Sequence, residues 1–159
     1  MNDWIWTTFF TLLPISELRG GLPYALANGI PWAAAYPYCV VVNALLAPII
    51  YVFLDTVHKL LYRWKFYAGI FDKLVERARV KLTAKVERFG FWGVAVFVGI
   101  PLPVTGAVTG TLGAWILGLS RRRTMLAVLV GVTISGLIVS GIFLLGIEAL
   151  DVFIKHVQA

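Results

Sequence analysis

Two segments of this chain, residues 31–54 and 124–147, are apolar, free of Lys, Arg, Asp and Glu, and long enough to cross a lipid bilayer. A transmembrane helix needs about 20 predominantly apolar residues. The composition agrees, because 60% of the residues are hydrophobic and 14% are charged, whereas soluble domains are roughly 45–50% apolar. We therefore expect an all-α integral membrane protein that forms a single membrane domain over residues 1–159.

Each long apolar segment follows a shorter one that proline and glycine interrupt, at residues 4–30 and 91–119. Neither half of an interrupted segment is long enough to cross alone. Such a segment is either a broken helix that crosses once or a re-entrant helical hairpin that enters and leaves on one face. In both cases its non-helical backbone must be buried in protein or line a water-filled cavity.

The basic residues favour the hairpin. Residues 58–90 carry nine of the fourteen Lys and Arg residues, and three more follow the second interrupted segment at residues 121–123. Basic loops tend to stay on the cytoplasmic side, and a re-entrant hairpin over 91–119 keeps both clusters there. We expect a multi-pass protein of the plasma (inner) membrane, with 58–90 and 121–123 cytoplasmic.

Residues 58–90 also predict an amphipathic helix on the membrane surface. Apolar side chains recur at helical spacing on one stripe, and basic side chains lie on nearly the opposite one. Beside a spanning segment this charge is typical of attraction to anionic lipid heads, so we expect membrane lipids and no nucleic acid as partners. The apolar stripe comprises Phe71, Val75, Ala78, Leu82, Val86 and Phe89.

The order of segments predicts an inverted repeat. Repeat 1 covers residues 1–57 and repeat 2 covers 91–159, and each contains a hairpin followed by a transmembrane helix. A shift of 89 residues places Pro14 on Pro103, Ser16 on Thr105 and Gly21 on Gly110. Interrupted short segments in corresponding halves point to a transporter site near the bilayer midplane. We expect the two hairpin tips to meet there.

The first tip contains two charges at membrane depth, Glu17 and Arg19. Charged groups inside membrane segments usually face a cavity and take part in transport or proton relay. Arg19 offers planar donors suited to phosphate or carboxylate, and the amides of Gly20 and Gly21 would add an anion site at a half-helix start. Glu17 would take up and release a proton. The structural alternative is an ion pair between Glu17 and Arg19 that locks the hairpin.

Other polar and small residues are weaker candidates for binding substrate. Asn43, midway along the first span, favours an interhelical hydrogen bond worth about 0.6 kcal/mol over a substrate role. At the second tip, packing explains the small residues as well as substrate binding does; the candidates there are Pro101, Pro103, Thr105 and Thr109. His58 and His156 lack further ligands at metal spacing, and the sequence contains none of the common catalytic or phosphate-loop motifs. We expect no metal, no cofactor and no enzymatic activity.

The segments Pro14–Pro23 and Ile100–Thr111 resemble the small multidrug export protein family of prokaryotic integral membrane proteins. The chain is also distantly similar to the DedA superfamily, whose members have paired re-entrant hairpins and are implicated in proton-coupled flipping of phospholipids and polyprenyl-phosphate. By this resemblance Glu17 matches the acidic residue of the first hairpin. DedA proteins also carry arginines in the second hairpin, whereas residues 91–119 here contain no charge.

These patterns together predict a membrane transporter for an amphiphilic or lipid-phosphate substrate, possessing no cofactor and coupled to protons through Glu17. Small residues in the second span permit close helix packing, so we expect a homodimer. The alternative is a membrane scaffold or assembly factor that transports nothing. The first eighteen residues lack Lys and Arg, so a cleavable signal is not indicated and the N-terminal apolar stretch is expected to remain in the mature protein.

Overall fold

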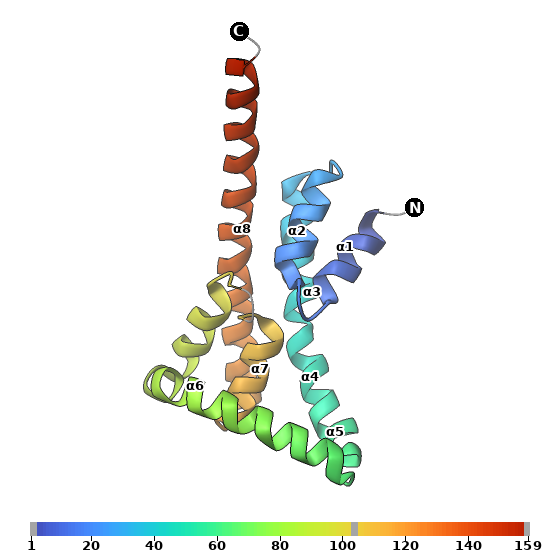
Figure 1. The fold of residues 1–159 in the computed structure, drawn as a ribbon, viewed down its shortest axis with the longest axis vertical. Coiled ribbons are helices and arrows are strands. Elements are labelled where there is room, and N and C mark those ends of the chain that lie inside the picture. The colour runs from blue at the N-terminus through green and yellow to red at the C-terminus, as the bar shows by residue number, and fades with distance from the viewer. Residues whose placement is uncertain (1–2, 103–104, 158–159) are drawn as a thin grey trace.

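The computed structural model describes residues 3–102 and 105–157, and their regular structure is helical throughout, as predicted. Figure 1 shows α8 running from the top of the molecule down to α6, with the other helices grouped around its lower part. The helices are α1 (Asp3–Leu12), α2 (Glu17–Ala27), α3 (Trp32–Ala44), α4 (Leu46–Asp55), α5 (Val57–Leu61), α6 (Lys65–Gly99), α7 (Ala107–Ile116) and α8 (Arg121–Val157).

Two helical stretches are long and apolar enough to cross a membrane. Trp32–Asp55 has 24 residues with a mean hydropathy of 2.0, and Arg121–Gly146 has 26 residues with a mean hydropathy of 2.5. At 1.5 Å per residue they are about 36 and 39 Å long, which exceeds the roughly 30 Å of hydrocarbon in a bilayer. They coincide with the two predicted spans.

The first long stretch spans the predicted length but is divided at Leu45. α3 ends at Ala44 and α4 begins at Leu46. Pro48 has no backbone N–H, so the carbonyl of Ala44 loses the partner that a continuous helix would provide. The division lies beside Asn43, halfway along the stretch.

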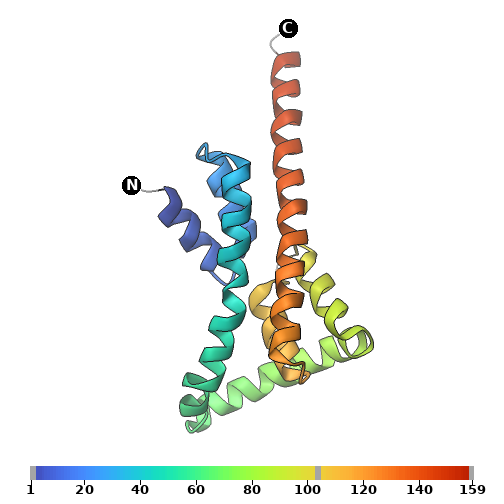
Figure 2. The same cartoon turned by 180° about the vertical axis from the view of Figure 1, so that it is seen from behind.

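The first interrupted segment forms a pair of short helices, α1 and α2, joined by Leu13–Ser16. The two helices lie side by side in both views (Figures 1 and 2). They approach closely because Gly21 lacks a side chain, and a Cβ there would overlap with the Thr11 hydroxyl. With 10 and 11 residues, each helix is only about 15 Å long. We refer to α1, α2 and their connection as the first helix pair.

The second interrupted segment forms a corresponding pair. α6 bends sharply at Gly90, whose φ of 48° is left-handed and strained for other residues. The part beyond the bend, Gly90–Gly99, packs beside α7. We refer to Gly90–Gly99, α7 and their connection as the second helix pair. The bend coincides with the predicted boundary between residues 58–90 and 91–119.

Before the bend, α6 lies across the foot of α8 (Figure 1). An aromatic cluster fixes it to α5 and α7: the ring of His58 stands 4.1 Å from that of Phe71 and 5.9 Å from that of Trp115. Phe71 belongs to the predicted apolar stripe, while the side chains of residues 74–89 lie outside the described part of the structure. The helical course is thus as predicted, and the amphipathic division of its surface stays a prediction.

The buried core lies where both helix pairs meet α3 and α8. Its apolar members include Leu18, Leu22, Val98, Val128 and Val132. Near the foot of the molecule, Arg121 and Asp55 form an ion pair of 2.8 Å that joins the ends of α8 and α4. These contacts hold the two helix pairs against the long helices.

Candidate functional site

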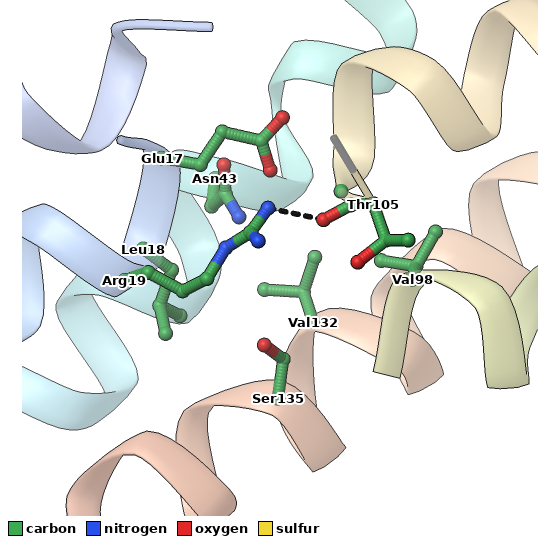
Figure 3. Close-up of a pocket in the computed structure, with 9 residues that line it drawn as sticks. Glu17, Leu18, Arg19, Asn43, Val98, Thr105, Val132 and Ser135 are labelled. Carbon is green, nitrogen blue, oxygen red and sulfur yellow. Dashed lines mark hydrogen bonds between the residues drawn. The ribbon is translucent and has the colours of Figure 1, made fainter. Parts of the chain in front are cut away.

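The connecting turns of the two helix pairs approach each other from opposite directions, part-way along α8 (Figures 1 and 2). Polar side chains from the first pair and α3 lie in the interface between them (Figure 3). Glu17 and Asn43 are each only 3% exposed, and Arg19 is half-buried. The two connecting turns are thus in contact, as predicted, and their position near the bilayer midplane stays a prediction.

Glu17 caps the first turn of α7. The backbone N–H of Ala107 donates to Glu17 Oε2 at 2.8 Å, and the N–H of Val108 donates to Oε1 at 3.2 Å. The first N–H groups of a helix have no partner within it, and this end carries a partial positive charge. A carboxylate from α2 therefore satisfies two donors of α7 and complements their charge.

Gly106, immediately before α7, makes room for this cap. A Cβ at this position would lie 2.6 Å from Glu17 Cδ and would overlap with Oε2. The φ of Gly106 is −177°, an extended value open to any residue, so the position needs glycine for space and not for conformation. The N–H of Gly106 donates to Thr109 Oγ1 at 3.0 Å.

The backbone of Glu17 is itself unusual. Its φ is 49°, in the left-handed region that costs a non-glycine residue about 1–2 kcal/mol. Such conformations persist where the surrounding structure imposes them, and they cluster at functional sites. Here the backbone conformation accompanies the placement of the carboxylate against α7.

Arg19 also reaches the second helix pair. Its Nη2 donates to the backbone carbonyl of Thr105, and Figure 3 shows the guanidinium lying across the interface. Among the described residues no ion pair joins Arg19 to Glu17. Glu17 and Arg19 thus each bond separately to the second helix pair and hold the interface together. The ion pair between them, which the sequence left as the structural alternative, is not formed in the described part of the chain.

Asn43 points into the same interface with an unused acceptor. It lines a space together with Glu17, Arg19 and Ser135, and its Oδ1 has no hydrogen-bond partner within the described structure. Leaving a buried acceptor unsatisfied costs about 1–3 kcal/mol. The expected interhelical hydrogen bond is therefore not made by this oxygen.

The space itself is closed. The side chains around Glu17 and Asn43 leave no room for a water molecule between them. On its other side, however, Arg19 lines an open groove of about 260 Å³. The remaining lining of the groove is apolar: Pro23, Pro101, Val139, Ile142 and Phe143. Arg19 thus connects the closed interface to an apolar groove.

The structure brings four of the predicted site residues together, namely Glu17, Arg19, Asn43 and Thr105. Pro101 lies in the groove, and Pro103 lies outside the described residues. The remaining three have local roles: the Gly20 N–H donates to the Ser16 carbonyl at 3.2 Å, Gly21 packs on Thr11, and Thr109 bonds to Gly106.

The sequence does not predict the roles of Ala107 and Val108, and it indicates packing roles for Ser135 and, as the even alternative to substrate binding, for Gly106. It placed the anion-binding helix start at Gly20 and Gly21, whereas the helix start that holds an anionic group is that of α7. A local signal exists, because an apolar run resumes directly after the break at Gly106, with Thr109 three residues later. That signal marks a helix start, but it does not reveal which group caps it.

Two long apolar helices with two short helix pairs meeting between them are the features of an all-helical membrane protein. The chain matches the family described as "Putative small multi-drug export protein" over residues 17–138, and it belongs to that family. The match begins at Glu17, directly after the first connecting turn, and includes the second turn. Neither the curated proteins nor the solved structures contain a match to the chain.

Proposed function

We propose that this protein moves an amphiphilic anion across the plasma membrane, either a lipid phosphate or an acidic amphipathic drug. The observation that carries this proposal is the position of Arg19, whose side chain is the charged member of an otherwise apolar groove. A guanidinium suits phosphate and carboxylate, while the apolar lining suits a hydrocarbon tail. The family name supports export of small molecules.

In this proposal the helix pairs are re-entrant hairpins of an inverted repeat. The first enters from the outer face and the second from the cytoplasm, so that residues 58–90 and 121–123 are cytoplasmic. Support comes from the shortness of the paired helices and from their connecting turns, which meet part-way along α8. Opposed half-helices at mid-depth are a common construction of transporter sites. It is the arrangement that the resemblance of the sequence to the DedA superfamily implies.

Glu17 is the proposed proton-coupling residue. Of the described residues that line the closed space, it is the one with a carboxyl group. Protonation would weaken its acceptance of hydrogen bonds from α7, because a neutral carboxyl is a poorer acceptor than a carboxylate. Proton uptake would then loosen the contact between the two hairpins.

Transport is tested with the full chain in proteoliposomes. Fluorescently labelled phosphatidate is added to one leaflet, and its movement is followed by quenching with a reagent that does not cross the bilayer. We expect Arg19→Gln to abolish protein-dependent movement and Arg122→Gln, which removes an exposed arginine outside the groove, to leave it unchanged. A second arm uses an acidic amphipathic dye, which distinguishes lipid from drug. If neither probe moves with the wild-type protein, the chain is a scaffold or assembly factor.

The topology is tested by cysteine labelling in a Cys39→Ala background. Ile15 is 93% exposed at the first turn, and Leu102 is exposed at the second. We expect Ile15→Cys to react from the outside, and Leu102→Cys and Arg122→Cys to react from the cytoplasm. Labelling of Arg122→Cys from the outside would contradict the inverted repeat. The proposed homodimer is tested on the same preparations by light scattering.

A further inference from the structure

The start of α7 already holds an anionic group, and that group belongs to the chain itself. The two oxygens of Glu17 accept from two successive backbone N–H groups, which is also how a helix start binds a phosphate or a carboxylate ligand. The neighbouring cation, Arg19, is bonded to a backbone carbonyl and not to Glu17. The donors needed for an anionic head group are thus present but occupied.

We propose that the Glu17 carboxylate is an internal substitute for the anionic head group of the substrate, and that the two exchange at the start of α7. Resting on the proposed function, this assigns the N–H groups of Ala107 and Val108, together with Arg19, as the head-group site. The head group binds when Glu17 has taken up a proton and released these N–H groups. In the closed structure the carboxylate keeps the site filled.

Asn43 provides independent support, because it lines the same space as Glu17 and its Oδ1 is buried without a hydrogen-bond partner within the described structure. An ionised carboxylate has no proton to donate, whereas a protonated carboxyl has one O–H donor. In the closed structure Asn43 Oδ1 therefore has nothing to accept from Glu17. Once Glu17 is protonated, Asn43 Oδ1 becomes its acceptor and the carboxyl has a second position.

The charged side chains around the space determine how many protons enter with each head group. Among the described residues around the space, drawn from α2, α3, α6, α8 and the start of α7, the charged side chains are Glu17 and Arg19. An unpaired charge in a buried site is strongly unfavourable. In the observed state the Glu17 carboxylate offsets the charge of Arg19 without forming an ion pair with it, and in the exchanged state the bound anion offsets this charge. One proton from water therefore enters the site with each negative charge of the head group.

Octyl sulfate is the probe that tests the exchange, because its charge stays −1 over the working pH range. Binding is measured by tryptophan fluorescence of the full chain in lipid nanodiscs, with empty nanodiscs subtracted. In the wild type only the fraction of molecules whose site is free of the Glu17 carboxylate can bind the probe. Removing the carboxylate therefore raises the apparent affinity by the inverse of that fraction. We expect Glu17→Gln to bind octyl sulfate about tenfold more tightly than wild type at neutral pH.

Gly106→Ala should change the affinity for octyl sulfate in the opposite direction. Its Cβ occupies the place of the carboxylate, so it excludes both Glu17 and the head group, and we expect octyl sulfate binding to be lost. A merely structural contact would shift both variants in the same direction. Asp55→Asn, which removes a carboxylate at the foot of α4, is the matched control and should bind as wild type does.

The pH profile provides a measurement that does not depend on any variant. Wild-type affinity for octyl sulfate should rise as the pH is lowered, and the affinity of Glu17→Gln should stay constant. A flat wild-type profile overturns the exchange, as does unchanged or weaker binding by a folded Glu17→Gln protein.

These experiments measure binding and do not depend on transport across the bilayer. If exchange is observed without any lipid or dye movement, the transport proposal fails and the head-group site stands; if movement is observed without exchange, the reverse holds.

Discussion

Replacing Gly106 by alanine tests the contact between the two helix pairs most directly. The added Cβ would lie 2.6 Å from Glu17 Cδ and would overlap with Oε2, so the carboxylate must leave the start of α7. Two hydrogen bonds to Ala107 and Val108 are then lost. A hydrogen bond to a charged group contributes about 1.5–3 kcal/mol. Allowing for partial replacement by water, we expect the free energy of unfolding to fall by about 2–4 kcal/mol.

The measurement is a denaturant titration of the protein in mixed micelles, followed by circular dichroism. Gly141→Ala is the matched control, because a Cβ there meets nothing within 4 Å; it should raise stability by up to about 1 kcal/mol through helix propensity. The decisive comparison is a double-mutant cycle with Glu17→Ala, in which the clash is absent. If Gly106→Ala costs as much in that background as in the wild type, the Gly106–Glu17 contact is not the cause and the reasoning is wrong.

Three further predictions concern other parts of the molecule. Asn43→Leu removes an unsatisfied buried acceptor and should raise the free energy of unfolding by about 1 kcal/mol; a loss of stability would mean that the amide has a structural partner. Asp55→Asn breaks the partly exposed ion pair with Arg121 and should cost less than about 1 kcal/mol in the same titration. The hydrogen bond that Tyr62 donates to Asp72 raises the pKa of its phenol, so Asp72→Asn should lower that pKa towards its ordinary value. The absorbance titration of Asp72→Asn, with Tyr62→Phe as reference, checks this shift.

Local patterns of the sequence predict the helices and the boundaries of this fold well. Hydropathy locates the two long stretches because burial in lipid depends on each residue and its near neighbours. The change from basic to apolar sequence near residue 90 likewise marks the bend in α6, where Gly90 takes a left-handed conformation. Pro48 indicates that the first span can kink, but the sequence does not determine that the helix divides there into α3 and α4. Proline kinks some membrane helices and leaves others continuous, depending on what packs against them.

The partners of the charged residues lie beyond the reach of local patterns. The Glu17 carboxylate bonds to amides about 90 residues away, and nothing within a helical turn of Glu17 specifies them. The sequence instead suggested Arg19, which is close in the chain and opposite in charge. The structure separates the two because each finds a backbone partner on the second helix pair. The resemblance between the two tips suggested that they meet, but not which groups touch.

The energetics of Glu17 bear on whether this contact is only a structural lock. A purely structural contact is most stable when its residues have unstrained backbones and its buried polar atoms are hydrogen-bonded. Such agreement between local and overall structure is the rule in protein interiors. Here the residue that makes the contact has a left-handed backbone, which costs about 1–2 kcal/mol. The adjacent Asn43 keeps a buried acceptor unsatisfied, at a further cost of about 1–3 kcal/mol. Both costs fall on the closed state, so together they bring its free energy nearer to that of an open state. A protonated Glu17 bonded to Asn43 would recover the second cost, as the proposed opening of this contact requires.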